Sequence, residues 1–312
     1  MLILYKKPPV IFLLFLSLFS TAAFGQQSFK DILKMKTEKQ IRSIIDSSPA
    51  ITGLMVIDLT NGESSGINED LVFPTASAIK VSILMEVFRQ ASAKKFALTD
   101  MRTIEPRNIV GGSGVLKDLP DPVSLSIRNL CVLMMLLSDN TATNTILELV
   151  TLKSVNTTMQ SLGFNNTRVQ RKMMDMAAAG RGEENISSPS EAAGIMQLLF
   201  KGNFISKTMS ADILSLMSGK DREDSRIAKS IPASVPIIFK PGSLTGVSTE
   251  WAVVNLKERP YVVVMMENFK VEGMATDIME KVSGVLYQYF WRLGNATKYG
   301  SYIDPKTIQP YP

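Results

Sequence analysis

A serine and a lysine stand three positions apart in FPTASAIKVSILMEVF, residues 73–88, at the start of an apolar-periodic segment. Pro74 and Thr75 are a helix-start signal, so the pattern predicts Ser77 in the first turn, where unpaired backbone N–H groups and the helix dipole favour developing negative charge. Lys80 then falls on the same helix face, within reach of the Ser77 hydroxyl. Because a desolvated lysine loses its proton readily, the pair predicts a serine nucleophile with a lysine as its base.

The absence of histidine strengthens this interpretation. None of the 312 residues is a histidine, which excludes a Ser-His-Asp triad, a Cys-His pair and the usual zinc sites. Cys131 is the single cysteine, so no internal disulfide can form, and its apolar surroundings LCVLMMLL are typical of an inert core thiol. We therefore expect hydrolytic chemistry with no metal and no cofactor.

Two further polar motifs follow the Ser77 segment in order. The tetrad itself is weak evidence, since a second Ser-x-x-Lys occurs at 92–95 on a polar helix end. However, SDN at 138–140 directly follows a buried apolar run, and KPGS at 240–243 ends a predicted strand, where glycine lets a ligand approach the strand edge. Three ordered motifs indicate one site assembled from distant parts of the chain.

The elements that must position these motifs divide the chain into three parts. An apolar stripe predicts a helix over 28–48, and two strands with an Asn61-Gly62 turn follow over 51–67. Helical patterns fill 73–230, with helix starts marked by Ser124, Thr151 and Ser190, and three strands and a helix follow Pro232. The order predicts an α+β fold, with an antiparallel sheet built from both termini, flanked by helices, and an inserted all-α lobe.

The domain organisation follows from this division. Residues 1–25 combine a basic start, a short apolar run and a small-residue ending, which predicts a cleaved signal peptide and a periplasmic or secreted protein. Residues 26–312 are expected to form a single catalytic domain, with an α/β lobe over 26–72 and 231–312 and an all-α lobe over 73–230. The chain carries 34 basic and 29 acidic residues, scattered along its length, which argues against a nucleic-acid partner. We expect no stable membrane span and a monomer.

The three motifs together resemble those of class A serine β-lactamases and penicillin-binding proteins. The resemblance covers essentially the whole mature chain, and it includes VGGSGVL at 110–116, SDNTATN at 138–144 and KPGSLTGVSTEWAVV from 240 onward. It implies a β-lactamase/transpeptidase-like fold. It also implies that Ser77 is the acyl-accepting nucleophile, that Lys80 is its proton partner and that Ser138 relays a proton to the leaving nitrogen. The backbone N–H groups of Ser77 and Ser243 would form the oxyanion hole.

The remaining implied residues bind substrate. Asn140 would hold the substrate amide, and Lys240, Gly242 and Ser243 would bind at the carboxylate end. Pro241 departs from the family pattern, which has threonine or serine there. Proline removes a hydroxyl and a backbone donor, which an edge strand can tolerate.

A second departure concerns deacylation. The family has an arginine followed two residues later by a glutamate that activates water, but here Arg171 is followed by Met173 at the glutamate position. A thioether cannot take a proton from water, so another carboxylate would have to turn inward. Asp175 is the first candidate for this catalytic role, with Glu183 and Glu184 behind it.

The competing hypothesis for Asp175 is structural. Arg171 and Asp175 are four residues apart and could form an ion pair that holds the loop. Asn185 stands where the family has the aspartate that pairs with the arginine, which favours such an internal pair.

The sequence thus predicts an exported serine hydrolase that is acylated on Ser77 by a β-lactam and hydrolyses its amide. Two alternatives stay open. One is a penicillin-binding-type D,D-peptidase or esterase acting on a peptidoglycan-like amide, and the other is a binding or sensor protein that is acylated without turnover.

Overall fold

The structure is a computed structural model that describes residues 28–271 and 277–302. The predicted signal peptide lies outside the described residues. Within them, no helix combines the length and apolar character that a bilayer span needs.

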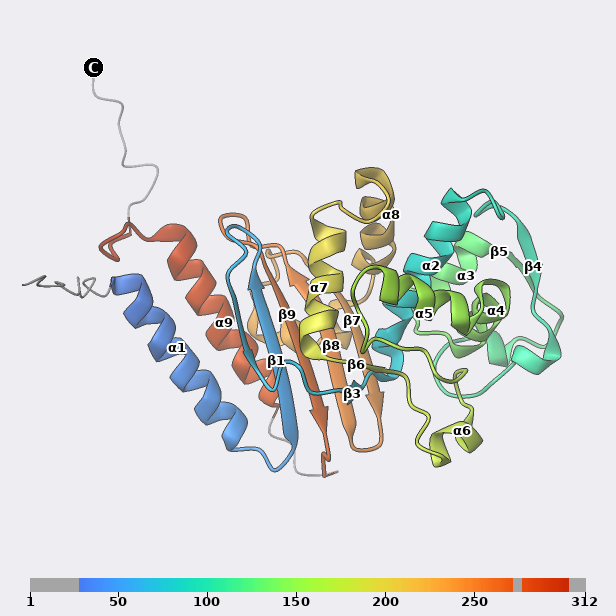
Figure 1. The fold of residues 1–312 in the computed structure, drawn as a ribbon, viewed down its shortest axis with the longest axis horizontal. Coiled ribbons are helices and arrows are strands. Elements are labelled where there is room, and N and C mark those ends of the chain that lie inside the picture. Colours follow the sequence, from blue (N-terminus) through green and yellow to red (C-terminus); the bar gives the residue numbers. More distant parts are fainter. Residues whose placement is uncertain (1–27, 272–276, 303–312) are drawn as a thin grey trace, which may run out of the picture.

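A five-stranded antiparallel sheet forms the centre of the molecule (Figure 1). Its order is β2-β1-β9-β8-β7, so strands from the two ends of the chain pair at β1 and β9. The bounds are β1 Ile51–Asp58, β2 Ser64–Ile67, β7 Ile237–Leu244, β8 Val247–Val254 and β9 Tyr261–Asn268. The predicted α+β class and the assembly of the sheet from both termini are therefore confirmed.

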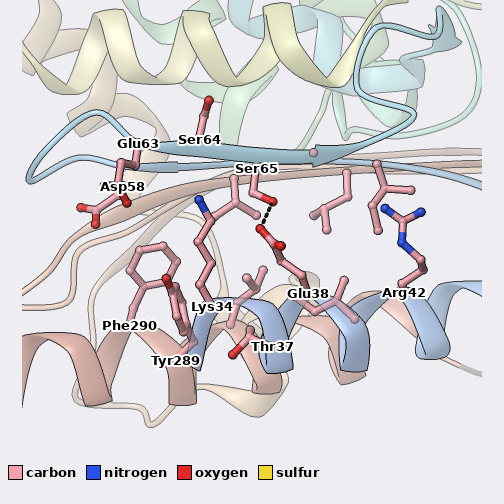
Figure 2. A pocket seen from close by; sticks show the side chains of 16 residues that line it. Lys34, Thr37, Glu38, Arg42, Asp58, Glu63, Ser64, Ser65, Tyr289 and Phe290 are labelled. Atoms are coloured by element: carbon pink, nitrogen blue, oxygen red, sulfur yellow. Dashed lines mark hydrogen bonds between the residues drawn. The ribbon is translucent and has the colours of Figure 1, made fainter. Parts of the chain in front are cut away.

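One face of the sheet packs against α1 (Phe29–Asp46) and α9 (Ile278–Asn295). Side chains alternate along a strand, so Tyr261 and Val263 of β9 join this layer while Val262 and Val264 join the opposite one. Figure 2 shows the two helices beneath the strands, with Phe290 of α9 facing them. Phe290 stacks on Tyr261 with ring centroids 4.1 Å apart.

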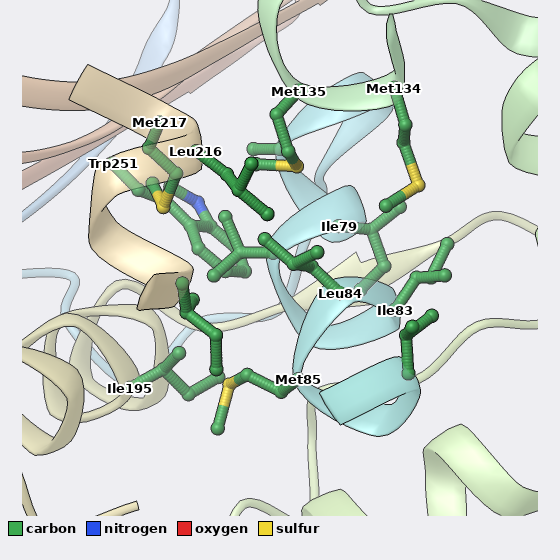
Figure 3. Packing of buried hydrophobic residues seen from close by; sticks show 14 of the residues in the cluster. Ile79, Ile83, Leu84, Met85, Met134, Met135, Ile195, Leu216, Met217 and Trp251 are labelled. Carbon is green, nitrogen blue, oxygen red and sulfur yellow. The ribbon is translucent and has the colours of Figure 1, made fainter. Parts of the chain in front are cut away.

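The opposite face packs against α7 (Pro189–Phe200), which Figure 1 shows lying over the strands. Helices α2 (Lys80–Ser92) and α8 (Lys207–Ser218) extend the same apolar layer into the helical block. Figure 3 shows this layer, where Trp251 of β8 lies beside Met217 of α8, and Ile195 of α7 lies near Met85 of α2. The helical block and the sheet therefore share one core, and α7 belongs to the sheet's own layers although it lies within 73–230.

The rest of the helical block carries the first two polar motifs. Its helices are α2 Lys80–Ser92, α3 Ile127–Leu136, α4 Asn140–Val150, α5 Leu152–Ser161, α6 Met176–Gly180 and α8 Lys207–Ser218. Two small antiparallel sheets lie among them, β3 (Phe73–Pro74) with β6 (Ile186–Ser187) and β4 (Met101–Thr103) with β5 (Ser124–Ser126). The prediction of an all-helical segment is wrong at these four short strands.

Helix α2 is buried on nearly all sides, because α3, α4, α5 and α8 surround it. This central position fixes Lys80 at its first residue inside the protein. Cys131 of α3 is fully buried in the same core, and burial raises the pKa of its thiol to about 12. The prediction that the Cys131 thiol lies buried in the core is confirmed.

Candidate active site

Ser77 lies in a short 3₁₀ helix, η1 (Ala76–Ile79), and α2 begins only at Lys80. The predicted α-helical first turn is therefore wrong in detail. Thr75 precedes η1, but its side chain makes no capping hydrogen bond; its backbone N–H and its hydroxyl both donate to the carbonyl of Asn185, at 2.8 and 2.9 Å. The turn that carries Ser77 is thereby bonded to the loop that contains Asn185.

Two buried lysines converge on the hydroxyl of Ser138. Lys80 Nζ donates to the Ser138 carbonyl at 2.6 Å, to its Oγ at 3.2 Å and to Asn140 Oδ1 at 2.9 Å. Lys240 Nζ donates to the same Oγ at 2.9 Å. Because a hydroxyl has two lone pairs and one proton, two incoming donors leave the proton of Ser138 free for another acceptor. The geometry thus prepares Ser138 as a proton donor.

The two lysines are held in poorly solvated surroundings. Burial, more than any other cause, lowers the pKa of Lys80 to about 7, while the charge of Asp139 opposes the shift. Burial also lowers the pKa of Lys240 well below its usual value, and the positive charges of Lys80 and Lys220 lower it further. Near neutral pH a large share of Lys80 is therefore unprotonated and able to accept a proton.

The structure does not show a hydrogen bond between the Ser77 hydroxyl and Lys80 among the described residues. The three protons of a charged Lys80 are directed at Ser138 and Asn140 instead. Loss of one proton would free a lone pair on Nζ. The role predicted for Lys80 as a base therefore requires its neutral form.

Asp139 fixes the SDN turn, a role that the sequence did not reveal. Ser138 has a left-handed backbone, with φ of 53°, which a non-glycine residue adopts only when its surroundings enforce it. The carboxylate of Asp139 accepts the N–H groups of Val115 at 2.7 Å, Leu116 at 2.9 Å and Ala142 at 2.8 Å. These bonds cap α4 and hold the Ser138 hydroxyl in place.

The third motif approaches Ser77 through a glycine. A Cβ on Gly242 would lie 2.6 Å from the carbonyl oxygen of Thr75 and 2.8 Å from the backbone nitrogen of Ser77. Only glycine allows β7 and the turn to come this close, which places the backbone of Ser243 beside that of Ser77. Pro241 lacks a backbone N–H, but β7 is the edge of the sheet, so there is no further strand to which that N–H would have to donate.

Ser77 stands where two hollows meet. The first, which we call the methionine hollow, has a volume of about 390 Å³, and the second, the polar hollow, about 340 Å³. Both are lined by Ser77, Ser113 and Ser243. The methionine hollow adds, among others, Asn140, Met173, Met174, Met176, Glu184, Leu244 and Val247. The polar hollow adds, among others, Ser138, Lys220, Arg226, Gly242, Thr249 and Glu250.

The polar hollow contains groups that the motifs did not reveal. Lys220 is almost buried, donates to the carbonyl of Leu136 at 2.8 Å, pairs with Asp224 at 2.5 Å and adds positive charge beside Lys240. The buried Thr249 hydroxyl has no hydrogen-bond partner within the described part of the chain. Burial raises the pKa of Glu250 to about 7, against hydrogen bonds from Ser225 and the backbone of Arg226. Lys220 and Arg226 line this hollow together with the acidic residues Asp224 and Glu250, and the two basic side chains with the open hydroxyl of Thr249 could bind a carboxylate-bearing ligand.

Met173 occupies the wall of the methionine hollow and is 7% exposed. Asn144 of α4 holds its backbone from both sides, accepting the N–H of Met173 at 2.8 Å and donating to its carbonyl at 3.1 Å. These two bonds from α4 fix the backbone of residue 173 and thereby the direction of its side chain. Sequence reasoning did not identify Asn144, although it lies six residues after Ser138 on the motif helix.

The structure does not bring Asp175 to this site. Its side chain is exposed, its carboxylate accepts the N–H of Ala178 at 3.0 Å to cap α6, and it lines neither hollow. Glu183 pairs with Arg181 at 2.8 Å on the surface. The geometry therefore gives Asp175 a capping position, and the catalytic role predicted for it has no support here.

The loop is closed by a different ion pair from the one expected. Arg171 pairs with Glu184 at 2.8 Å, so the hypothesis of an Arg171–Asp175 pair is wrong. Asn185 supports the same closure, because its Oδ1 accepts the N–H groups of Gln170 at 2.8 Å and Arg171 at 3.1 Å. The carboxylate that the loop needs comes from the residue next to Asn185.

The fold and the three motifs together are typical of β-lactamases and penicillin-binding proteins, the class in which a nucleophilic serine works with a lysine. The sequence profile of the Beta-lactamase enzyme family matches residues 36–290. The chain belongs to this family.

Named relatives agree with this assignment. The chain is 26% identical to β-lactamase CARB-3 of Pseudomonas aeruginosa over 210 residues, which cover 67% of this chain and 73% of the relative. Among solved structures, a β-lactamase from Sphaerobacter thermophilus has a TM-score of 0.71 at 27% identity, covering 81% of this chain and 94% of the other. PBP-A has a TM-score of 0.75 at 25% identity, covering 82% and 96%, and a mutant of PBP-A has been solved as an acyl-enzyme complex with penicillin G.

Proposed function

We propose that the protein is a serine hydrolase that β-lactams acylate on Ser77, and that it hydrolyses the β-lactam amide with slow release of the acyl group. The observation that carries this proposal is the position of Ser77. It lies at the junction of two hollows, beside the network in which Lys80 and Lys240 both donate to Ser138.

Acylation would proceed by proton transfers among these groups. Neutral Lys80 takes the Ser77 proton as Oγ attacks the lactam carbonyl, and the backbone N–H groups of Ser77 and Ser243 stabilise the oxyanion. When the tetrahedral intermediate collapses, the C–N bond breaks and Ser138 gives its proton to the leaving nitrogen. Lys80, now charged, returns a proton to Ser138 at 3.2 Å. The substrate carboxylate would face Lys240 and Lys220 in the polar hollow.

The methionine hollow suits an apolar acyl side chain. Met173, Met174 and Leu244 line it, and thioethers pack adaptably against aromatic rings. Met174 narrows the mouth of the methionine hollow. Its sulfur lies so close to Gly112 that a Cβ added there would be 3.1 Å from it. Penicillin G, whose acyl group carries a phenyl ring, is therefore a suitable test substrate.

Deacylation is the step with the weakest chemical support, because Met173 cannot activate water. This favours a second candidate function, that of a penicillin-binding-type D,D-peptidase or esterase that passes its acyl group to another acceptor. The similarity to PBP-A fits this candidate as well. A protein that is acylated without turnover is the limiting case.

Mass spectrometry after incubation with penicillin G tests acylation. We expect a covalent adduct that is lost in Ser77→Ala, and the absence of any adduct would overturn the proposal. Chromogenic cephalosporin hydrolysis then separates the candidates. Slow turnover after a stoichiometric burst supports the hydrolase, whereas a burst alone supports the binding protein.

We also propose that the protein is exported, because the sequence of residues 1–25 is typical of a signal peptide. N-terminal sequencing of the mature protein from the periplasm or medium should begin near residue 26. An unprocessed chain in the cytoplasm would contradict this.

A further inference from the structure

We propose that the cavity between α1 and the β1–β2 hairpin is a binding site for a small amphipathic carboxylate, separate from the active site. The cavity has a volume of about 300 Å³. This is at the lower end of the range of small-molecule sites, about 300–1,000 Å³. None of its lining residues lines either hollow at Ser77.

The floor of the cavity is apolar. It is made by buried side chains of α1, β1 and α9 that belong to the core on this face of the sheet. These are Ile41, Leu54, Val56, Leu286 and Phe290. An apolar body that entered the cavity would replace water against this floor, which favours binding in proportion to the apolar surface that it covers.

Three charged residues of α1, at four-residue steps, face the cavity. Figure 2 shows Lys34, Glu38 and Arg42 extending from successive turns of the helix toward the strands. Side chains at this spacing normally pair along a helix. Here the carboxylate of Glu38 instead accepts the hydroxyl proton of Ser65 on β2 at 2.9 Å, so it is held by the hairpin and not by Arg42.

Among the residues that the structure describes, Arg42 has no counter-ion. Acidic residues stand four positions away on both sides, Glu38 and Asp46, yet within the described ranges Arg42 forms no ion pair with either. Its guanidinium stands at one end of the cavity (Figure 2). A planar guanidinium recognises a carboxylate with two parallel hydrogen bonds, so the ligand's charged group is assigned to Arg42.

The opposite end of the cavity has a different charge. Asp58 and Glu63 line it, and Figure 2 shows them near Tyr289. Asp58 is neutralised by Arg259 at 2.6 Å. Glu63 forms no ion pair within the described part of the chain, and its negative charge fixes the orientation of an anionic ligand, with its carboxylate at Arg42 and its apolar end toward Phe290. Along α1 the distance from Arg42 to Lys34 is about 12 Å, close to the length of an extended ten-carbon chain.

Decanoate is therefore the probe, with decanol and decylamine as matched head-group controls. We expect isothermal titration calorimetry of the whole protein to show one decanoate site, and Arg42→Gln to weaken it about tenfold or more. Arg42 is exposed and unpaired, so the variant should fold normally. Lys39→Gln, which removes an exposed charge of α1 that does not line the cavity, should leave the affinity unchanged.

Three outcomes would overturn the proposal. Decanoate that does not bind would remove the site, and decanol or decylamine that binds as well as decanoate would remove the role of Arg42. Loss of decanoate binding in Lys240→Gln, with Arg42→Gln unaffected, would show that the ligand occupies the active site instead. Because the experiment uses no β-lactam, it is independent of the proposed function.

Discussion

Replacement of Met173 by glutamate should convert slow release of the acyl group into turnover. The side chain at position 173 lines the methionine hollow next to Ser77, and Asn144 holds its backbone by two hydrogen bonds. Glutamate has nearly the same length as methionine. We therefore expect Met173→Glu to keep the loop conformation and to place a carboxylate where the family has its water-activating base.

The magnitude follows from burial and from the chemistry of the base. Met173 is 7% exposed, so a carboxylate there loses hydration, which costs more stability than the about 1–3 kcal/mol of a neutral polar group. The same loss raises the pKa of the new carboxyl toward neutrality, where a general base is most effective. A positioned general base contributes about 10²–10⁴-fold. We expect the deacylation rate to rise within that range, with the acylation rate nearly unchanged.

The assay follows the lifetime of the penicillin G adduct by mass spectrometry and the steady-state hydrolysis of a chromogenic cephalosporin. Met173→Gln is the matched control, because it has the same shape without the base. Asp175→Asn tests the alternative base and should leave the adduct lifetime unchanged, since Asp175 caps α6. The reasoning is refuted if Met173→Glu folds but its adduct lasts as long as that of Met173→Gln.

Two further predictions concern acylation. Because the pKa of Lys80 is lowered to about 7 and its neutral form is the base, the acylation rate should rise with pH through about 7 and be ~100-fold below its plateau at about pH 5. Stopped-flow acylation measures this profile, and a flat profile over that range would exclude Lys80 as the base. Gly242→Ala puts a Cβ 2.6 Å from the Thr75 carbonyl oxygen and 2.8 Å from the Ser77 nitrogen, so one of the two backbones must move. We expect a loss of about 1–3 kcal/mol in unfolding free energy and about 10²-fold or more in acylation, and a variant with normal acylation would contradict the close approach.

Much of the fold could be predicted because its signals are local and repeated. The apolar runs of β8 and β9 are buried along almost their whole length, and each alternates between the two cores. The three motifs were equally readable, and the structure brings Lys80, Ser138 and Lys240 into one network. A helix or strand whose apolar residues recur at a regular spacing can be predicted without knowing which distant residues it contacts.

Other features depend on distant contacts and could not be predicted. The short strands β3 to β6 have two or three residues each, too few for any periodicity. Ser124, expected to start a helix, lies in β5, and Ser126 caps α3 instead. Two acidic residues could form an ion pair with Arg171. The four-residue spacing favours Asp175, but the partner is Glu184, because the loop brings it back beside Arg171 13 residues later. Lys220 carries no motif, and only the packing of α8 beside β7 reveals it.

The buried thiol of Cys131 makes this chain convenient for labelling studies. With its pKa raised to about 12 and no exposed surface, it should not react with maleimides while the protein is folded. A cysteine introduced at Met174, at the mouth of the methionine hollow, would then be the sole reactive position. A fluorophore attached there would signal the arrival and departure of an antibiotic in real time, with no need to remove a native residue first.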